Sequence, residues 1–563
     1  MKQAIKDFFK NGGTPVTFIF CCLMLYVFCV EMYENKKDFI QLSRNISIEE
    51  NNLLGEHIYS VINSEDTSIY NDLYRSVISY KYNKLKKENY TISEPFIAYN
   101  LYGTNLLGLN LYFQTDIESY LDYTVHVEDE KIPDFSRTLN NGEKDNLTKT
   151  HEYQLIGLVK GYKNTILLEL KDETGNVLST KEFQIDLSNL ETNSQLFATV
   201  TEGESKESLE DGLYTICGND SDEQDYMSAY DNGGILRSEI PIIGYRSHRI
   251  LFTDQGEMLF SISQTRIVKM SRLGEVLKIY RTGQYLLHHD YVFSDDGNIL
   301  VLANNTEKDT EEDCIIKINL ETSEVTELID FEPMFQSYVD ICYWDKESAR
   351  DEGEDGLDWL HLNSIVYVDG DIIVSSRETS SIIKVKNIET TPTLDYIISN
   401  EKIWAGSDYT DYLYTQVGDF KIHAGQHSLN YTKGEEDGVY YLSFFDNNYG
   451  NSTSRPDFDF TKVGITNQNG FSGDFSYYYV YKIDENKKTF ELMDSLELVY
   501  SGIVSNIQNL DNGNLLTDSG TVGYFAEYDK EHQLIRGFSL TLNKYMVYRV
   551  FKYNYHDVWF YSK

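Results

Sequence analysis

The chain is poor in basic residues relative to acidic ones, and this imbalance limits the partners it can have. Its 563 residues include 49 Lys and Arg but 90 Asp and Glu, so the formal net charge is −41. Phosphate backbones are bound by basic surfaces, so nucleic acid is not expected as a partner. The acidic residues indicate a soluble, self-repelling surface. They form no D-x-[DN]-x-[DN]-G calcium loop, and no metal or other cofactor is predicted.

Cysteine is also scarce. Three of the six cysteines lie in one apolar run near the N-terminus, and the other three, Cys217, Cys314 and Cys342, are far apart in the sequence. No C-x-x-C pair and no Cys/His ligand spacing occurs, which argues against zinc and dithiol chemistry. One disulfide among these three cysteines is compatible with the sequence, and none is required.

Proline is rare and aromatic residues are abundant. The chain has seven Pro but 45 Tyr and 28 Phe, together with many short runs of Ile, Val and Tyr. Branched and aromatic side chains fit the pleated surface of a sheet, so the chain is expected to be mostly β. With 41% apolar residues it can bury a large core, and its length indicates more than one domain.

The one long apolar run, VTFIFCCLMLYVFCV at residues 16–30, follows three lysines. Fifteen residues are short for a membrane span and long for the core of a secretory signal. The run is followed by EMYE, which offers no small-residue cleavage site, and the preceding lysines favour an N-terminus inside the cell. We expect residues 1–34 to be a cytoplasmic tip and an uncleaved signal anchor, with a cleaved signal peptide as the alternative. Either one places the rest of the protein, membrane-anchored or free, on the extracytoplasmic side.

Beyond this run the pattern changes twice. Residues 35–90 are charged, with patches of helical spacing, and are expected to form a helical stalk. Residues 91–195 show alternating strand patterns, and the stretch from Asp172 to Asn176 indicates a hairpin turn. This segment is expected to be a small β-sandwich domain.

A strand-rich unit recurs six times beyond Gly212. Each copy has a turn ending in Gly or Asp, an apolar strand, a polar stretch and one or two further strands, as in GEMLFSISQTRIVKMSRLGEVLKIY from Gly256. Strand repeats at intervals of about 40 residues or more are typical of β-propellers. The predicted fold is therefore all-β, with a six-bladed β-propeller at residues 205–563 preceded by the small β-sandwich domain, the helical stalk and the N-terminal transmembrane anchor. A longer array of sandwich domains is the alternative.

Histidine opens the first strand of four of the six repeats, although the chain has only eleven histidines. These histidines are His248, His288, His361 and His427. The innermost strands of a propeller run beside its channel, so residues at their beginnings converge at one mouth. Aligning HHDYVFSDDG with HLNSIVYVDG without a gap pairs His288 with His361, which favours His288 over His289 as the channel-facing residue.

Polar residues near His361 strengthen this pattern. Asn363 lies two positions further and faces the same way, and Arg377 ends the strand that returns from the turn at Gly370. Imidazoles and a guanidinium together suit an anionic tetrahedral group. A single histidine at a strand start is more often a turn residue, and Arg377 alone is more often part of a salt bridge. Only the shared blade position favours a site.

Several of these segments resemble a known family. HHDYVFSDDGNILVLA, DWLHLNSIVYVDGDIIVSSR, AGQHSLNY and YMVYRV are similar to segments of the bacterial arylsulfate sulfotransferases, which use no nucleotide sulfate donor (no PAPS). IPDFSRTL and KNTILLELKDETGNVLSTKEFQI are similar to the amino-terminal β-domain of that family. The resemblance covers residues 92–551.

The resemblance implies a ping-pong transfer of a sulfuryl group from an aryl sulfate donor to a phenolic acceptor through a sulfohistidine. It implies that His427 is the nucleophile and that His361 and Arg377 bind and polarise the sulfuryl oxygens. The implied catalytic set is completed by His288 or His289, and the implied substrate-binding residues are Asn363 and Tyr548. Because dimers are known in the family, a homodimer is a further expectation by analogy.

Two other functions stay open at this stage. One is a propeller that binds a ligand without turning it over, and the other is an aryl sulfate hydrolase in which water is the acceptor. A sialidase-type propeller is disfavoured because no S-x-D-x-G-x-T-W repeats occur. The sequence also departs from some periplasmic members of the family, because no closely spaced cysteine pair lies near the G-Q-H segment.

Overall fold

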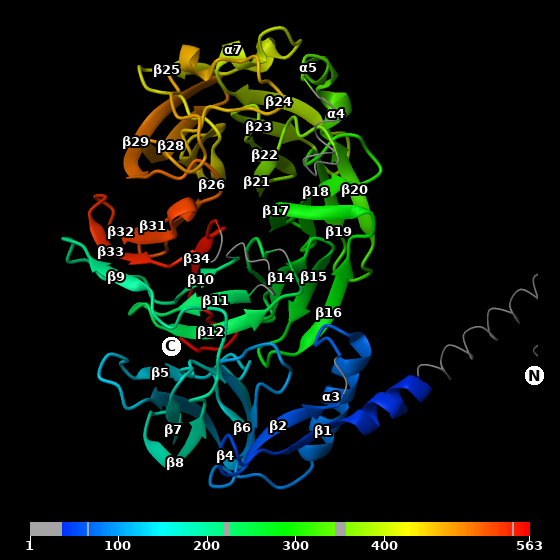
Figure 1. Cartoon of the computed structure of the whole chain (residues 1–563), viewed down its shortest axis with the longest axis vertical. Coiled ribbons are helices and arrows are strands. Elements are labelled where there is room, and N and C mark those ends of the chain that lie inside the picture. Colours follow the sequence, from blue (N-terminus) through cyan, green and yellow to red (C-terminus); the bar gives the residue numbers. More distant parts are fainter. Residues whose placement is uncertain are drawn as a thin grey trace, which may run out of the picture.

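The structure is a computed structural model that describes residues 36–64, 67–218, 226–244, 246–343, 356–542 and 545–562. In these ranges the chain forms an N-terminal β domain and a ring of six sheets above it (Figure 1). The prediction of an all-β fold with a six-bladed propeller is confirmed. Cys217, Cys314 and Cys342 are free, so the disulfide that the sequence left open is not formed among them.

The predicted membrane anchor at residues 16–30 lies outside the described residues. Where the structure is described, no helix combines the length and the apolar composition that a membrane crossing requires. The anchor and the extracytoplasmic location therefore stay predictions.

The predicted helical stalk at residues 35–90 needs correction. Residues 36–45 are helical, but β1 (Ile46–Glu50) and β2 (Ile58–Asn63) then form an antiparallel pair, and β2 pairs in parallel with β3 (Phe96–Tyr99). The helix α3 (Asp72–Leu85) follows, with Asn71 as its N-cap. The helical spacing was correct for α3, but its apolar side chains are buried against the sheet. This segment is thus part of the N-terminal domain and not a stalk.

The N-terminal domain consists of two sheets that share the long strand β4 (Gly108–His126). The first half of β4 pairs with β3 and β6 (Thr148–Ile156), and the second half pairs with β5 (Phe135–Thr138) and β7 (Lys163–Lys171). The strand β8 (Val177–Asp186) completes the second sheet. Apolar side chains of both sheets belong to one buried cluster, as the predicted sandwich requires.

Each propeller blade is a separate sheet of at least four strands, antiparallel except for the parallel edge pair of β25 and β29 in the fifth blade. The first blade contains β10 (Leu213–Ile216), β11 (Tyr226–Tyr230), β12 (Leu236–Pro241) and β34 (Val550–Tyr553). The second contains β13 (Leu251–Phe252), β14 (Met258–Ser263), β15 (Arg266–Met270) and β16 (Val276–Arg281). The third contains β17 (Tyr285–Phe293), β18 (Ile299–Asn305), β19 (Cys314–Ile318) and β20 (Val325–Asp330).

The other three blades follow the same plan. The fourth contains β21 (Leu362–Val368), β22 (Asp371–Ser376), β23 (Ser381–Lys386) and β24 (Thr393–Ile398). The fifth contains β25 (Thr415–Val417), β26 (His427–Lys433), β27 (Val439–Asp446), β28 (Phe475–Asp484) and β29 (Thr489–Val499). The sixth contains β30 (Asn506–Asn509), β31 (Leu515–Ser519), β32 (Tyr524–Tyr528), β33 (Leu534–Ser539) and β9 (Thr199–Glu202).

The ring is closed at both ends of the propeller sequence. The C-terminal strand β34 pairs with β10 as the innermost strand of the first blade, and β9 pairs with β33 as the outermost strand of the sixth. The propeller therefore begins at β9, slightly before the predicted residue 205. Lys552 of β34 forms a buried ion pair with Glu527 of β32, 2.7 Å between Nζ and Oε2, which joins the first and sixth blades.

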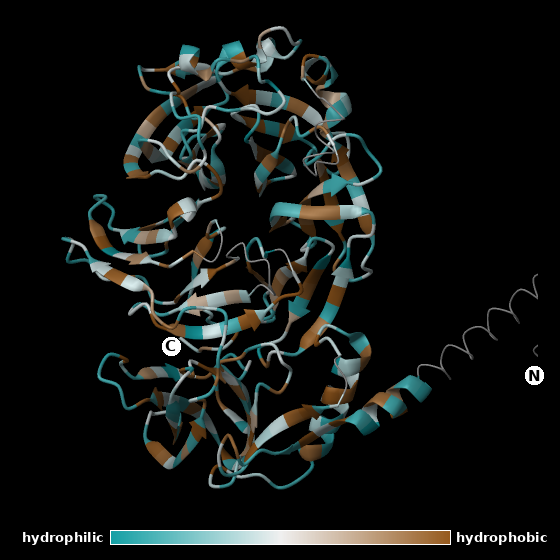
Figure 2. Ribbon diagram, viewed as in Figure 1, coloured by the Kyte–Doolittle hydropathy of each residue, from teal (hydrophilic) through white to brown (hydrophobic). Residues whose placement is uncertain are grey.

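Turn chemistry and hydropathy explain why the repeats fold this way. The turn from β21 to β22 has φ of 51° at Asp369 and 85° at Gly370, and two positive φ values define the type I′ hairpin. Figure 2 shows apolar stretches along the strands and hydrophilic residues in the connections. Inner strands such as β18 and β22 are buried over most of their length because neighbouring blades cover both faces.

The N-terminal domain packs directly on the propeller. One buried apolar cluster extends from the sandwich into the first, second and sixth blades. Asn105 donates a hydrogen bond from Nδ2 to Ser238 Oγ at 3.0 Å, and Trp559 donates one from Nε1 to Gln154 Oε1 at 3.0 Å. The two domains therefore share one continuous core.

Candidate active site

The innermost strands of three blades carry the same kind of backbone irregularity. The φ values are 49° at His289, 50° at His361 and 63° at Ser428, and the strand register shifts at or within three residues of each position. Non-glycine residues in this region are strained, and bulges change the direction of the side chains around them. Figure 1 shows β17, β21 and β26 at the inner rim of the ring. His289 lies within β17, His361 directly before β21 and His427 at the start of β26, and His427 interacts electrostatically with both other histidines. We call the region where these three side chains meet the mouth of the channel.

The ring of His289 is the one that faces His361. The two ring centroids are 4.8 Å apart, and the side chain of His289 is 11% exposed. His288 is buried, and its Nε2 has no hydrogen-bond partner. The ungapped alignment favoured His288 because an alignment without gaps cannot account for the bulge after Leu287. This bulge shifts the channel-facing position by one residue.

His361 is held between two carboxylates. Its Nδ1 lies 2.6 Å from Asp358 Oδ2 and 2.8 Å from Glu312 Oε2. Burial and the charge of Arg377 lower the pKa of His361, but the two carboxylates outweigh them and the pKa rises to about 9. His361 is therefore an imidazolium at neutral pH.

Arg377 follows β22 and lies beside this pair, as expected from its place at the end of the returning strand. Its Nη2 lies 2.6 Å from Glu378 Oε1 and 3.4 Å from Asp358 Oδ2. Burial opposes the charge of the guanidinium, but these carboxylates raise its pKa above the ordinary value. Its Nε is buried without a hydrogen-bond partner, so one donor of the guanidinium is uncommitted.

His427, in contrast, is neutral. Its Nδ1 lies 3.0 Å from the carbonyl oxygen of Gly425 and 2.7 Å from Asn447 Oδ1, and both are uncharged acceptors. Burial lowers the pKa of His427 to about 3, and the positive charges of His361 and Arg377 act in the same direction. One mouth thus holds a neutral imidazole beside an imidazolium and a guanidinium.

Asn363 and Tyr548 are the predicted substrate-binding residues. Asn363 is fully buried and donates from Nδ2 to the carbonyl oxygen of Gln426 at 2.8 Å. Tyr548 is also buried and donates from its hydroxyl to the carbonyl oxygen of His289 at 3.1 Å. Both side chains therefore bond to the backbone of a segment that carries a site histidine, and a role of either residue in substrate binding stays a prediction.

His248, which also opens an innermost strand, does not join the group at the mouth. It is buried, and its ring packs edge-on against Tyr548 with 5.7 Å between the centroids. Its Nδ1 lies 3.3 Å from Ser261 Oγ. His248 therefore takes part in the packing beneath Tyr548.

The sequence did not indicate four polar neighbours of the site, which are Glu312, Asp358, Glu378 and Asn447. Asp358 stands three residues before His361, and an acidic residue close to a candidate histidine is a signal that could have been used. The other residues of this set were not part of any pattern. Glu312 and Asn447 come from connections between strands, where no repeat marks their position.

The same carboxylates raise the question of a metal ion. Ligand atoms of Glu312, Asp358 and His361 lie within 4.8 Å of one another, as do those of Glu312 with His288 and His289. A divalent cation could be held by such groups. The short contacts of His361 and Arg377 with the carboxylates already balance their charge, so ion pairs account for the arrangement.

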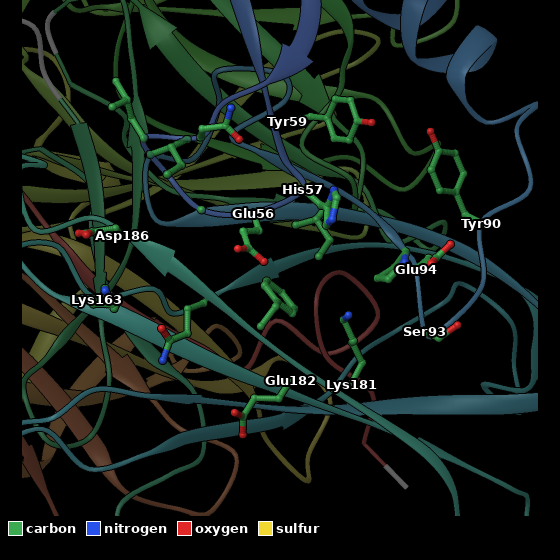
Figure 3. Close-up of a pocket in the computed structure, with 18 of the residues that line it drawn as sticks. Glu56, His57, Tyr59, Tyr90, Ser93, Glu94, Lys163, Lys181, Glu182 and Asp186 are labelled. Carbon is green, nitrogen blue, oxygen red and sulfur yellow. The ribbon is translucent and has the colours of Figure 1, made fainter.

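A cavity of about 810 Å³ lies elsewhere, in the N-terminal domain. Figure 3 shows side chains of both charges around it, including Lys163, Lys181, Glu56 and Glu182. All its lining residues belong to the N-terminal domain, so it does not include the histidines of the propeller. Its mixed charges favour no ligand of one sign.

Comparison with known proteins places these residues in a family. The family model described as arylsulfotransferase (ASST) matches residues 199–562. The chain belongs to this family. A second model, the arylsulfotransferase Ig-like domain, matches residues 96–188. The two matches correspond to the propeller from β9 onward and to the sandwich, and family membership supports a sulfotransferase enzyme in general terms.

Other comparisons add little. No curated protein matches the chain. Among solved structures, it is similar to a protein of unknown function from Bacteroides caccae, with 13% identity, a TM-score of 0.35 and coverage of 60% of this chain and 98% of the other. It is also similar to a putative 6-phosphogluconolactonase from Bacteroides fragilis NCTC 9343, with 11% identity, a TM-score of 0.33 and coverage of 78% and 98%. At these TM-scores neither similarity bears on function.

Proposed function

We propose that the protein transfers a sulfuryl group from an aryl sulfate to a phenol in two half-reactions, with His427 as the nucleophile. The observation that carries the proposal is the meeting of a neutral imidazole, an imidazolium and a guanidinium at one channel mouth. A neutral imidazole is a nucleophile at neutral pH, whereas the two cations suit the oxygens of a sulfate ester.

In the first half-reaction, the lone pair on Nε2 of His427 forms a bond to sulfur and the bond from sulfur to the phenolic oxygen breaks. The electron pair of that bond leaves on the phenolic oxygen, which takes the proton of the His361 imidazolium. Arg377 donates hydrogen bonds to the sulfuryl oxygens, which stabilises the charge on them in the transition state. His427 is then a sulfohistidine and His361 is neutral.

The second half-reaction reverses these steps with a new phenol. Neutral His361 accepts the proton of the phenol hydroxyl, and the phenolic oxygen attacks sulfur. The bond between nitrogen and sulfur breaks, and its electron pair returns to Nε2 of His427. The enzyme regains its starting protonation state, so donor and acceptor never need to occupy the site together.

The pKa of His361 supports aryl over alkyl esters as donors. A phenol ionises near pH 10, as tyrosine does. An acid with a pKa of about 9 can protonate a departing phenolate, because the phenol that forms holds the proton slightly more tightly. An alkoxide is a far poorer leaving group, and this site offers no stronger assistance for it.

The proposal is tested with a chromogenic aryl sulfate, with and without an added phenol. We expect rapid release of the chromogenic phenol only when the acceptor is present, and a mass increase of one sulfuryl group on His427 when the donor is added alone. His427→Gln is expected to abolish both results. His423→Gln, which alters a buried histidine of the same segment bonded to Tyr481, is the matched control and is expected to retain them.

The two other functions give different results in the same assay. Equal release with and without phenol would indicate a hydrolase, and no release from any aryl sulfate would indicate a binding protein. Full activity of His427→Gln would refute the role of this residue.

The proposal places the reaction outside the cytoplasm, because the apolar run at residues 16–30 follows lysines. Digestion of intact cells with an external protease tests this location. Protection of the propeller in intact cells, together with its digestion after lysis, would contradict it.

A further inference from the structure

The side-chain amide of Asn447 is oriented by two backbone carbonyl groups. Its Nδ2 donates to the carbonyl oxygen of Ser501 at 2.7 Å and to that of Val504 at 3.1 Å. Only the NH₂ end of an amide can donate, so the oxygen end must point the other way. That oxygen, Oδ1, lies 2.7 Å from Nδ1 of His427. Asn447 is fully buried, so rotating the amide would leave both carbonyl groups without these donors.

This orientation determines which nitrogen of His427 carries hydrogen. The Nδ1 atom faces two oxygens, Asn447 Oδ1 and the carbonyl oxygen of Gly425, and neither has a hydrogen to donate. Nδ1 must therefore be the donor. Because the buried ring is neutral, the other nitrogen, Nε2, keeps its lone pair.

We propose that Asn447 is the positioning residue that holds His427 with Nε2 as the free nitrogen and that stabilises the ring when Nε2 bonds to sulfur. This inference rests on the proposed function and adds a residue to it. When Nε2 gives its electron pair to sulfur and the phenolate leaves with the pair of the broken bond, Nδ1 keeps its hydrogen and the ring becomes positively charged. Hydrogen bonds from charged donors are stronger than those from neutral ones, so the bond to Asn447 strengthens as the reaction proceeds.

The neutral amide explains how two histidines at one mouth take opposite protonation states. His361 faces the carboxylates of Asp358 and Glu312 and is protonated. His427 faces an amide oxygen and a carbonyl oxygen and stays neutral. A carboxylate in place of Asn447 would keep the same tautomer, but it would also favour protonation of the ring and remove the nucleophile. The type of hydrogen-bond acceptor, charged or neutral, therefore determines which histidine is the acid and which is the nucleophile.

The first test is independent of turnover. The full-length protein is labelled with ¹⁵N-histidine, and His427 is assigned by comparison with His427→Gln. Nitrogen NMR without substrate is expected to show hydrogen on Nδ1 and an unprotonated Nε2. A spectrum with hydrogen on Nε2 would overturn the inference. If the wild-type protein turns over no aryl sulfate, the proposed function fails, whereas this spectrum still decides the tautomer.

The second test compares two variants of Asn447. Asn447→Leu removes the acceptor and is expected to lower kcat about 10- to 100-fold, as loss of a hydrogen bond to a charged group does. Asn447→Asp keeps an acceptor and is expected to retain kcat at high pH, while the acidic limb of the pH profile moves up by about one to three units. Rescue by aspartate with a shifted pH profile is a result that a merely structural role would not produce.

Asn467→Leu is the matched control, because Asn467 is a buried amide in the same connection that bonds to the backbone of Asn448 and Asp474. It is expected to retain kcat. Wild-type kcat in Asn447→Leu would overturn the inference. Equal losses in the leucine and aspartate variants without a shift of the pH profile would also overturn it. Should the leucine variant fail to fold, the aspartate variant and the spectrum of the wild type still decide.

Discussion

Replacing Asp358 by asparagine is expected to lower the pH above which activity falls. Asp358 Oδ2 lies 2.6 Å from Nδ1 of His361, and the pKa of His361 is raised from an ordinary 6.5 to about 9. That difference corresponds to about 3 kcal/mol in favour of the imidazolium. Asp358 shares this effect with Glu312, which is 2.8 Å from the same atom. Loss of one of two such partners is expected to lower the pKa by about one to three units.

The assay is the pH dependence of kcat/KM for a chromogenic aryl sulfate. This profile reports the free enzyme, so its basic limb follows the imidazolium of His361. In the wild type the limb is expected near pH 9, and in Asp358→Asn it is expected at about pH 6–8. At about pH 8 the variant then has lost about half or more of its protonated His361, whereas at about pH 5 the two proteins differ much less.

A basic limb that stays near pH 9 in Asp358→Asn would refute the assignment of the acid to His361. Asp371→Asn is the control, because it removes a carboxylate from the opposite end of β22, the strand that leads to Arg377. Its profile is expected to match that of the wild type. The shape of the profile is the decisive result, since Asp358 also contacts Arg377 and the variant can change substrate binding at every pH.

Three further predictions concern binding and stability. Arg377→Lys is expected to lower kcat/KM for the aryl sulfate about 10- to 100-fold, because an ammonium cannot replace the donor fork of a guanidinium; an unchanged value would remove Arg377 from the sulfuryl site. Burial raises the pKa of Asp446 from 3.8 to about 7, so between these pH values the folded protein binds more protons than the unfolded protein. The thermal unfolding temperature is therefore expected to fall as the pH rises from about 4 to about 7, and to fall less in Asp446→Asn. Lys552→Met is expected to destabilise the protein by about 3–5 kcal/mol in urea unfolding, because Glu527 is left buried without its ion-pair partner, and the double change with Glu527→Gln is expected to recover part of the loss.

The repeated parts of the fold could be predicted from the sequence because they obey local rules. The turn at Asp369 and Gly370 has the residues that a type I′ hairpin requires, and the apolar runs between such turns are the strands of the blades. The positions of His361 and His427 followed from the same register, since each stands at the start of an innermost strand.

The parts that could not be predicted depend on contacts between distant segments. The choice between His288 and His289 depended on a bulge, and no residue type in that stretch marks it. Glu312 and Asn447 reach the site from connections of the third and fifth blades, where spacing carries no information. The helix α3 was recognised as helical, but its docking on the N-terminal sheet depends on partners far away in the sequence.

The closure of the ring by β34 has a consequence for how the enzyme is made. Residues of this strand pair with β10, and Thr215 contacts Tyr555 across 340 positions of sequence. During synthesis on the ribosome, the first blade lacks its innermost strand until residues 550–553 emerge, and Arg549, which binds the carbonyl oxygen of Asn363 beside the site, emerges with them. A product that ends before residue 549 lacks both the closing strand and this contact, so it is expected to be inactive.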